Sequence, residues 1–444
     1  MLDIKFIREN PQIVKEGCKK KQVKVDIDRL LEADKRRREI LQALEDIRAQ
    51  KNKASKEISR IKNEREKRKI ILKMRELDKN SDRLNKTLKD LENEFNNLML
   101  QIPNLPFGEE LRSSSHFARL HLARVDDVPI GKDEKDNVIL REWGEKPKFD
   151  SKVKNYLEIA ENLDLIDIKR AAKVSGTRFG YLKREAALIE FALINFAFDT
   201  LIKQGFIPVI PPVMIKPEMA LAMGYLEQTD DQEAYFLPKD NLYLVGTAEQ
   251  SLGSMHAGEI FEENDLPKRY AGFSTCFRRE AGSYGKDTRG MFRVHQFDKV
   301  EMFSFTKPED SIKEHKFFLS LEEELMTSLK LPYQVVNICT ADLGRPAAAK
   351  YDIEAWVPSQ KRYRETHSTS NCTDFQARRL NIRYKDKSGK TNLVHTINGT
   401  AFSMRPLIAI LEIYQRKDGK IDVPKVLQKY LPGHQKVIPF LPRQ

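Results

Sequence analysis

Charged and aromatic residues recur at alternate positions of two neighbouring segments, residues 270–280 and 292–302. This alternation with apolar residues predicts two half-buried strands, each with one face toward a core. The polar face carries Arg278 on the first strand, and Phe297 and Glu301 on the second. Arginine suits a phosphate, an aromatic ring suits a base and a carboxylate suits a cation, so this face could hold a nucleotide. An ordinary amphipathic hairpin with a solvated polar face is the alternative.

A glycine-spaced loop joins the two predicted strands. Its glycines are Gly282, Gly285 and Gly290, and the cations Lys286 and Arg289 stand beside them. Because glycine has no Cβ atom, its backbone can approach a ligand closely. The loop therefore favours a nucleotide site over an ordinary hairpin.

The run FRREAGSYGKDTRGMFRVHQFDKVEMF resembles motif 2 of class II aminoacyl-tRNA synthetases. Its particular residues resemble the form of this motif in the seryl-tRNA synthetase family. The resemblance implies that Arg278 holds the α-phosphate of ATP and that Phe297 stacks on the adenine ring. It also implies that Glu280 and the backbone near Val294 meet the adenine edge. The other ATP contacts implied in this motif are Arg279 and Arg293.

Residues 242–249, LYLVGTAE, are predicted to form a strand that ends in a turn. The T-x-E pattern of Thr247 and Glu249 is by itself typical of a helix cap, and that alternative stays open. The amino-acid pocket implied by the resemblance consists of Thr247, Ala248, Glu249, Glu301 and Thr400. Two carboxylates suit L-serine, which has both an ammonium and a hydroxyl group, and a site built to bond a hydroxyl rejects analogues that lack it.

Residues 365–380, ETHSTSNCTDFQARRL, resemble the family segment that holds ATP and its metal. Glu365 and Ser368 could share a Mg²⁺ ion, because this cation takes one or two protein oxygens together with phosphates and water. Thr366 and His367 are the other ATP contacts implied there. His367 stands where the family has a serine, which is a departure from the family pattern.

Residues 398–415, NGTAFSMRPLIAILEIYQ, begin with a turn and continue as a predicted helix with Pro406 in its first turn. Arg405 is therefore expected near a helix N-terminus, where free N–H groups and the helix dipole favour an anion. The segment resembles motif 3, which implies that Arg405 holds the γ-phosphate of ATP. The span from Thr400 to Arg405 is one residue shorter than usual, and Ile413 replaces an asparagine.

Two segments before these motifs are expected to support the site. Residues 184–204 have apolar residues at helical spacing. The following stretch, GFIPVIPPVMI, is typical of a strand with proline stops. It also resembles motif 1, which implies a homodimer interface.

Apolar residues at heptad spacing run from residue 30 to residue 98. The first series is interrupted at core positions by Arg37 and Lys51, and a second series, which begins at Ile70, is out of phase with it. The phase change predicts a break between residues 63 and 69, and hence an antiparallel helical hairpin.

This arm is strongly basic. Residues 19–75 contain 21 Lys and Arg against 10 Asp and Glu, so they hold nearly all of the net charge of +12. A dimerising or scaffolding coiled coil is the common alternative, but a basic rod with little compensating acid favours a phosphate backbone. The resemblance implies that the arm binds tRNA(Ser), with tRNA(Sec) as a further candidate.

The composition excludes several other classes of protein. A chain of 444 residues is long enough for two or three domains. Its four cysteines lack zinc-binding spacing, so a reducing compartment and no structural zinc are expected. The N-terminus has no apolar core, and no later run approaches the roughly 20 apolar residues of a membrane span. We therefore expect a cytoplasmic protein with no membrane partner.

The predicted fold is α+β, with an N-terminal antiparallel coiled-coil hairpin and a class II synthetase-like catalytic domain in which helices flank an antiparallel β-sheet. The expected boundaries are residues 1–106 for the arm, 107–130 for a linker and 131–444 for the catalytic domain, and residues 107–124 read as an insertion of unassigned role. The resemblance implies an aminoacyl-tRNA ligase that uses ATP and Mg²⁺ to form seryl-adenylate and charges tRNA(Ser). A paralogue that acts on another carrier and an inactive RNA-binding relative are the alternatives.

Overall fold

The computed structural model describes residues 1–108, 128–226, 233–281 and 290–439. The chain divides into two compact units, Met1–Pro103 and Asn104–Gln444. Most of the predicted insertion at residues 107–124, as well as Lys286 and Arg289, lies outside the described residues. None of the helices formed by the described residues combines the length and apolar character that a bilayer crossing requires.

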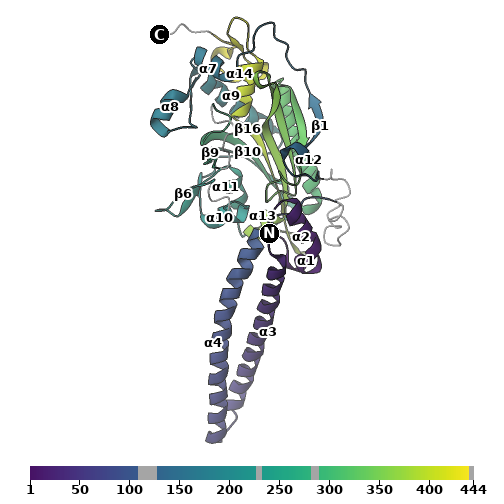
Figure 1. Ribbon diagram of the computed structural model, residues 1–444. Coiled ribbons are helices and arrows are strands. Elements are labelled where there is room, and N and C mark those ends of the chain that lie inside the picture. Colours follow the sequence, from purple (N-terminus) through teal and green to yellow (C-terminus); the bar gives the residue numbers. More distant parts are fainter. Residues whose placement is uncertain (109–127, 227–232, 282–289, 440–444) are drawn as a thin grey trace. The chain divides into compact units, whose positions relative to one another are not determined.

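The first unit is entirely helical in its regular structure. Its helices are α1 (Ile4–Glu9), α2 (Pro11–Lys20), α3 (Ile27–Ile58) and α4 (Glu64–Gln101). The two long helices, α3 and α4, run side by side as a rod (Figure 1). Ion pairs join Arg29 to Glu94 near one end of the rod and Lys51 to Asp78 farther along it. This pairing requires antiparallel helices and confirms the predicted hairpin.

The turn of the hairpin lies at residues 59–63, slightly before the predicted break. Asn63 caps α4 by accepting a hydrogen bond of 2.9 Å from the Arg65 N–H. Such a cap satisfies one of the donors that a helix start leaves without an intrahelical acceptor. The second helix therefore begins at Glu64, directly after its cap.

The two cations that interrupt the heptad pattern both have partners. Arg37 lies over the Phe95 ring, with 4.6 Å between the guanidinium carbon and the ring centre, and it pairs with Asp34 at 3.4 Å. Lys51 pairs with Asp78 on the opposite helix. The interruptions thus replace apolar contacts in the hairpin with cation–π and ionic contacts.

The second unit mixes helices and strands. Its α-helices are α7 (Tyr156–Asn162), α8 (Ile168–Ser175), α9 (Arg184–Lys203), α10 (Pro217–Met223), α11 (Glu249–Ser254), α12 (Ser311–Ser328), α13 (Phe375–Leu380) and α14 (Arg405–Ile413). The strands of its main sheet are β1 (Val138–Trp143), β4 (Ile207–Val209), β9 (Lys268–Phe277), β10 (Gln296–Thr306), β11 (Tyr333–Asn337), β12 (Ala349–Val357), β13 (Arg362–Thr373) and β16 (His395–Ser403). Short strands form two small two-stranded sheets, β2 (Ile166–Asp167) with β3 (Tyr181–Leu182), and β17 (Ile421–Asp422) with β18 (Val437–Ile438). Two further small sheets have three strands each. In one of them β7 (Leu242–Leu244) lies between β5 (Met214–Ile215) and β6 (Tyr235–Leu237), and in the other β14 (Arg383–Lys385) lies between β8 (Ile260–Glu262) and β15 (Thr391–Leu393).

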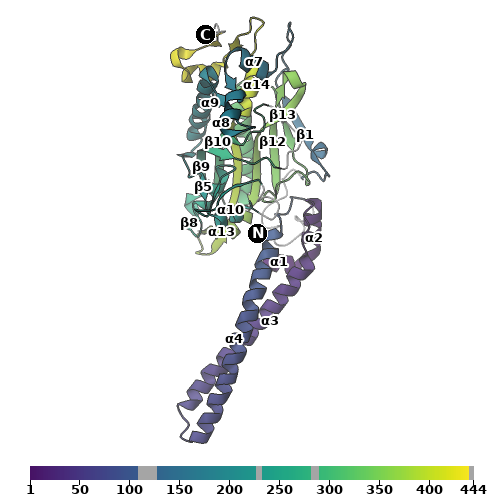
Figure 2. The ribbon, with the colours of Figure 1, turned by 60° about the vertical axis from the view of Figure 1, so that its left-hand side comes forward.

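Among the described residues, eight strands form the main sheet in the order β1, β11, β12, β13, β16, β10, β9 and β4. Neighbouring strands are antiparallel, except that β4 pairs with β9 in parallel. Figure 2 shows the central strands side by side, with α9 and α14 along the sheet. The prediction of an antiparallel sheet flanked by helices is confirmed.

The two strands of the predicted nucleotide-binding face are shorter than expected. β9 ends at Phe277 and β10 begins at Gln296, so Glu280 and Arg293 lie outside them. Glu280 has a φ of 52°, which a β-strand does not accommodate. The prediction of strands reaching residues 280 and 292 is wrong at these ends, because the alternation of residue types continues into the turn.

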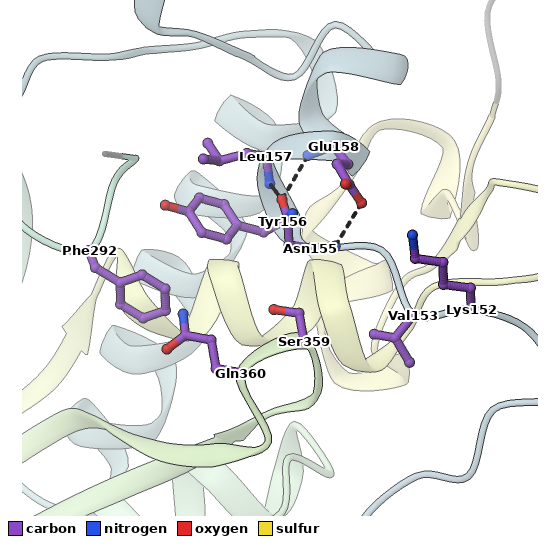
Figure 3. A pocket seen from close by; sticks show the side chains of 9 residues that line it. All are labelled: Lys152, Val153, Asn155, Tyr156, Leu157, Glu158, Phe292, Ser359 and Gln360. Carbon is purple, nitrogen blue, oxygen red and sulfur yellow. Dashed lines mark hydrogen bonds between the residues drawn. The ribbon is translucent and has the colours of Figure 1, made fainter. Parts of the chain in front are cut away.

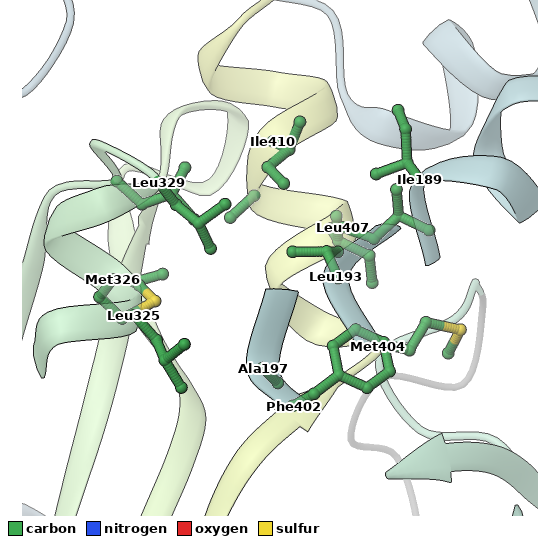
Figure 4. Packing of buried hydrophobic residues seen from close by; sticks show 14 of the residues in the cluster. Ile189, Leu193, Ala197, Leu325, Met326, Leu329, Phe402, Met404, Leu407 and Ile410 are labelled. Carbon is green, nitrogen blue, oxygen red and sulfur yellow. The ribbon is translucent and has the colours of Figure 1, made fainter. Parts of the chain in front are cut away.

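One face of the sheet packs against α9, α12 and α14. Met302 of β10 and Phe402 of β16 share an apolar cluster with Leu193 of α9, Leu325 of α12 and Leu407 of α14. Figure 4 shows these helices meeting around Phe402. Because side chains alternate along a strand, Glu301, which precedes Met302, points to the opposite face of the sheet. That face carries the site.

Short helices cover one end of that opposite face. Met223 of α10, Leu252 of α11 and Ala377 of α13 cluster with Phe303 and Phe305 of β10. This packing holds the start of α11 beside β10. It thereby brings residues from well before the two long strands into the neighbourhood of the predicted pocket.

Candidate active site

Arg278 lies directly after β9 and beside Phe297 of β10. Its backbone N–H donates to His295 O at 3.0 Å, and its Nε–H donates to Gly246 O at 3.0 Å. The guanidinium carbon is 5.3 Å from the centre of the Phe297 ring, within the range of a cation–π contact. The structure thus places together the predicted phosphate-binding and base-binding side chains.

Glu280 closes the turn after β9 in a left-handed conformation. Its carboxylate accepts from Arg293 at 3.1 Å, and its carbonyl accepts from Arg178 at 3.1 Å. The Arg279 N–H donates to Glu233 O at 2.9 Å, and Val294 is buried. Sequence reasoning missed Arg178, which lies about 100 residues away in the chain and gives no local signal.

Arg405 is the first residue of α14, as its position before Pro406 predicts. Its Nη1 lies 3.0 Å from Glu365 Oε2 and also donates to Glu365 O at 3.0 Å. Burial acts to raise the pKa of Glu365, but the positive charges of Arg405 and Lys350 prevail and lower it to about 2. Glu365 is therefore ionised at neutral pH and sits beside a cation at a helix N-terminus.

Ser368 lies opposite Asp352 in the β12–β13 ladder, and its hydroxyl acts to lower the pKa of the Asp352 carboxyl. Lys350 Nζ lies 3.1 Å from Asp352 Oδ2, whereas Asp352 Oδ1 has no hydrogen-bond partner among the described residues. Burial raises the pKa of Asp352 to about 7, although Lys350 opposes the shift. Oxygens from Glu365, Ser368 and Asp352 therefore face one small region, and one of them is unpaired, which fits a hard cation.

Thr366 and His367 behave differently from the other predicted ATP contacts. Both side chains are buried, and Thr366 Oγ1 donates to Ile353 O at 3.1 Å and lies 2.9 Å from His367 Nδ1. Burial lowers the pKa of His367 to about 4, so its ring is neutral at physiological pH. Only the backbone of these two residues remains for a ligand on the open face.

The predicted amino-acid pocket is a compact polar cluster. Thr247 Oγ1 donates to Glu301 Oε2 at 2.8 Å and accepts from Lys299 Nζ at 3.1 Å, and Lys299 forms an ion pair with Glu301. Thr400 lies opposite Glu301 in the β10–β16 ladder. The Glu249 N–H donates to Thr247 Oγ1 at 3.4 Å, but the N-cap of α11 is Ala248 and makes no side-chain hydrogen bond, so the helix-cap alternative for this pair is wrong.

Glu249 is the second carboxylate of the pocket, and Ala248 beside it is fully buried. Glu249 Oε2 accepts from Tyr225 Oη at 2.8 Å, and Oε1 accepts from Gln376 at 2.8 Å and from Asn398 at 3.1 Å. Burial, and after it the negative charge of Glu301, raise the pKa of Glu249 to about 7. The carboxyl is thus held by three neutral donors and titrates near neutral pH.

Sequence reasoning did not assign several residues of this cluster: Tyr225, Lys299, Gln376 and Asn398. Lys299 had a usable signal, because two predicted carboxylates in one pocket need a compensating cation and Lys299 lies on the same strand face as Glu301. The three neutral donors come from different elements, and no spacing in the sequence relates them to Glu249.

A separate pocket of about 430 Å³ opens beside the start of α7 (Figure 3). Its lining residues are Lys152, Val153, Asn155, Tyr156, Leu157, Glu158, Phe292, Ser359 and Gln360. Asn155 and Glu158 are engaged in capping α7, and Ser359 Oγ donates to Glu412 Oε1 at 2.8 Å. None of the predicted site residues lines this pocket, so we assign it no part in the chemistry.

Comparison with known proteins identifies the family. Residues 1–106 match the seryl-tRNA synthetase N-terminal domain, and residues 235–414 match the class II tRNA synthetase core domain (G, H, P, S and T). A serine–tRNA ligase of Dictyoglomus turgidum is 42% identical over 435 residues, which cover 97% of this chain and 98% of that protein. The chain belongs to the seryl-tRNA synthetase family. The predicted resemblance to this family is confirmed.

Members of the seryl-tRNA synthetase family with solved structures share the fold. The crystal structure of seryl-tRNA synthetase from Pyrococcus horikoshii complexed with ATP matches with a TM-score of 0.89 and 40% identity, over 100% of both chains. The cytoplasmic serine–tRNA ligase from Naegleria fowleri in complex with AMP matches with a TM-score of 0.83 and 32% identity, over 99% of both chains. The predicted fold class is thus confirmed over the length of the chain.

Proposed function

We propose that this protein is a serine–tRNA ligase, in which the carboxylate of L-serine attacks the α-phosphate of ATP to give seryl-adenylate and pyrophosphate. The terminal ribose hydroxyl of tRNA(Ser) then takes the seryl group and releases AMP. The observation that carries the proposal is a continuous set of contacts. Arg278 donates to Gly246 O, and Thr247, which follows Gly246 in the chain, donates to Glu301. A nucleotide held at Arg278 and Phe297 would therefore adjoin an amino acid held at Thr247 and Glu301.

The nucleotide side of the site acts by position and charge. Arg278 would hold the α-phosphate and Phe297 the adenine ring, and the guanidinium carbon lies 5.3 Å from the centre of that ring. Arg405 would hold the γ-phosphate from the start of α14, where the helix dipole adds to its charge. Glu280 and the backbone near Val294 would meet the adenine edge, with Arg279 and Arg293 as further ATP contacts. Thr366 and His367 would contact ATP through their backbone, because their side chains are buried. No side chain needs to act as a nucleophile, because both steps require alignment and charge neutralisation.

Mg²⁺ fits the oxygens of Glu365 and Ser368, with Asp352 as a third candidate ligand. The unpaired Oδ1 atom of Asp352 and the ionised Glu365 support this assignment. Bound there, the cation would neutralise charge on phosphate oxygens. Arg405 contacts Glu365 directly and would orient it toward the nucleotide.

The amino-acid pocket is short of positive charge. Glu249 and Glu301 are both buried, and Lys299 forms an ion pair with Glu301. The ammonium group of serine would supply a second positive charge, while Thr247 and Thr400 line the same recess. This arrangement favours a small amino acid that carries a hydroxyl group.

The proposal also includes tRNA binding by the arm, a homodimer and a cytoplasmic location. The basic excess of residues 19–75 lies in a two-helix rod, which suits a tRNA backbone. Exposed apolar side chains on α9 and β4 support a homodimer. All four cysteines are free, which suits a reducing, cytoplasmic setting.

Serine-dependent exchange of pyrophosphate into ATP, measured with and without tRNA, tests this proposal against its alternatives. A serine–tRNA ligase shows exchange with serine, far less with alanine, and forms seryl-tRNA when tRNA is added. An inactive RNA-binding relative shows no exchange. A paralogue for another carrier shows exchange and leaves tRNA uncharged.

A further inference from the structure

Glu322 of α12 reaches the sheet from the face opposite to the proposed pocket. Its side chain is fully buried among apolar residues of α12, including Phe318 and Leu325. Glu322 Oε1 accepts a hydrogen bond of 3.1 Å from the Thr400 N–H. Its other oxygen, Oε2, has no hydrogen-bond partner among the described residues. A buried carboxyl in this position needs an explanation, because an unpaired polar atom in a core destabilises the fold.

Gly399 provides the space that the carboxyl occupies. A Cβ atom at this position would lie 3.1 Å from Glu322 Oε1 and from Phe318 Cδ1, and 3.0 Å from Met302 Cε. These contacts are tighter than ordinary packing distances. The carboxyl of Glu322 therefore lies against the backbone of β16 where a larger residue would displace it.

The backbone that Glu322 contacts forms an irregularity in the sheet. Val300 pairs with Phe402, whereas the next residue, Glu301, pairs with Thr400, so Ala401 is an extra residue on β16. A bulge of this kind disrupts the ladder locally and re-aims the side chains beside it. Here it sets Thr400 directly opposite Glu301, and both belong to the proposed serine pocket.

We propose that Glu322 is a positioning residue for the serine pocket, which fixes the bulge at Thr400 by accepting its N–H from the far side of the sheet. This inference rests on the proposed function. Without the carboxyl, the Thr400 amide would lose an acceptor inside the core, and the strand could regain regular pairing. Regular pairing would shift Thr400 relative to Glu301, because a register shift of one residue turns side chains to the other face.

Burial favours the neutral form of the Glu322 carboxyl. Burial, and then the negative charges of Asp352 and Glu301, raise the pKa of Glu322 well above its usual range. The protonated acid keeps one carbonyl oxygen as an acceptor. Glutamine has the same length and the same acceptor, so Glu322→Gln should preserve the contact, whereas Glu322→Met fills similar space without any acceptor.

The test is pyrophosphate exchange on the full-length protein, with serine and ATP varied in turn. We expect Glu322→Met to raise the KM for serine about tenfold and to leave the KM for ATP within about twofold. Glu322→Gln should remain within about twofold of the wild type for both substrates. Glu324→Met, an exposed position on the same helix, is the matched control and should change neither value. Thermal unfolding of each variant reports whether it folds.

A second variant keeps the test informative if Glu322→Met does not fold. Gly399→Ala would crowd the carboxyl at 3.1 Å and should produce the same selective rise in the KM for serine. The inference is overturned if the serine KM is unchanged in the folded variants, if the KM for ATP rises equally, or if Glu322→Gln is as impaired as Glu322→Met. If the wild type itself shows no serine-dependent exchange, it is the proposed function that fails.

Discussion

Arg278 makes a backbone contact and an aromatic contact at the same time. Its Nε–H binds Gly246 O, and its guanidinium lies over Phe297. Arg278→Ala should reduce serine-dependent pyrophosphate exchange by at least about 100-fold, since loss of one preorganised donor at developing charge costs about that much. The unfolding temperature should change little, because the side chain is only partly buried.

Arg278→Lys is the matched control for charge alone. It keeps the cation and loses the planar fork, so we expect an activity well below the wild type and above that of Arg278→Ala. Near-normal exchange in Arg278→Ala would contradict the assignment of this residue to the α-phosphate.

Glu249 should make serine binding depend on pH. Burial and the charge of Glu301 raise the pKa of Glu249 to about 7, so this carboxyl is protonated below pH 7 and ionised above it. The ammonium group of serine favours the ionised form. The KM for serine should therefore rise as the pH falls, by about tenfold between pH 8 and pH 6 for a single titrating group. Initial rates of exchange at saturating ATP measure this dependence.

Glu249→Gln separates this titration from other effects of pH. It removes the titrating group, so the KM for serine should be higher than in the wild type and nearly constant from pH 6 to pH 8. A wild-type KM that does not vary over this range would show that Glu249 does not titrate in the free pocket.

At the residue scale, sequence predicts the side chains that belong to strands and motifs. The alternation along one strand places Phe297 and Glu301 on one face, and the structure brings both to the site with Arg278. The neutral donors to Glu249, such as Tyr225 and Gln376, come from distant elements. Their contribution depends on three-dimensional packing, which a single sequence does not encode as a spacing.

At the scale of elements, the base of the arm contains a buried carboxylate with three arginine partners. Asp34 is 0% exposed and lies 3.4 Å from Arg8, 3.4 Å from Arg37 and 3.1 Å from Arg38. Asp34→Asn would leave these cations without their shared partner. We expect the first unit to lose roughly 2 kcal/mol of stability, because Asp34 is buried and loses its charge-assisted contacts, while the arginines stay partly exposed to water. Chemical denaturation followed by helical circular dichroism measures this loss.

Asp78→Asn is the control for this substitution. Asp78 pairs with Lys51 across the same hairpin, but the pair is exposed, and exposed pairs contribute less than about 1 kcal/mol. Equal losses for the two variants would show that burial of Asp34 is not what makes its ion pairs important.

Elements differ in how far sequence determines them. The helices of the arm follow from the heptad spacing, and only the turn is displaced, because Asn63 caps the second helix early. The ends of β9 and β10 and the bulge at Thr400 are not predictable in the same way. They depend on the partner strand and on a carboxyl that arrives from another helix, Glu322 of α12.

At the scale of the whole molecule, apolar side chains on α9 and around β4 remain exposed. Phe191 is 61% exposed and Ile210 is 84% exposed. Exposed apolar patches of this kind mark protein interfaces. In the proposed homodimer, Ile210→Asp should raise the dissociation constant at least about tenfold, because it buries a charge at the interface. Sedimentation velocity over a range of concentrations measures the change.

Ile139→Asp is the matched control for this surface. Ile139 is 53% exposed on β1, at the other edge of the main sheet from β4. It should leave the dissociation constant unchanged. A wild type that is monomeric at micromolar concentration, or an equal effect of both substitutions, would contradict a dimer through α9 and β4.

The division into two units predicts that tRNA binding and serine activation are separable. Arg29 and Glu94 pair at 2.5 Å, so the start of α3 and the end of α4 lie close together. A short glycine–serine linker can therefore replace residues 30–98. Exchange activity without tRNA should remain within about threefold of the wild type, because Met1–Pro103 and Asn104–Gln444 are separate compact units.

Charging of tRNA(Ser) by the same variant should fall sharply, with the KM for tRNA raised about 100-fold or more. The deleted residues carry most of the basic excess. When their Lys and Arg side chains neutralise phosphates of the tRNA, counterions leave those phosphates, and this release favours binding. The affinity of the wild type for tRNA should therefore fall steeply between 50 and 200 mM salt, roughly 1000-fold for six neutralised phosphates, and that of the variant only weakly. Equal tRNA affinity in the two proteins, or equal salt dependence, would show that the charge of the arm serves another purpose.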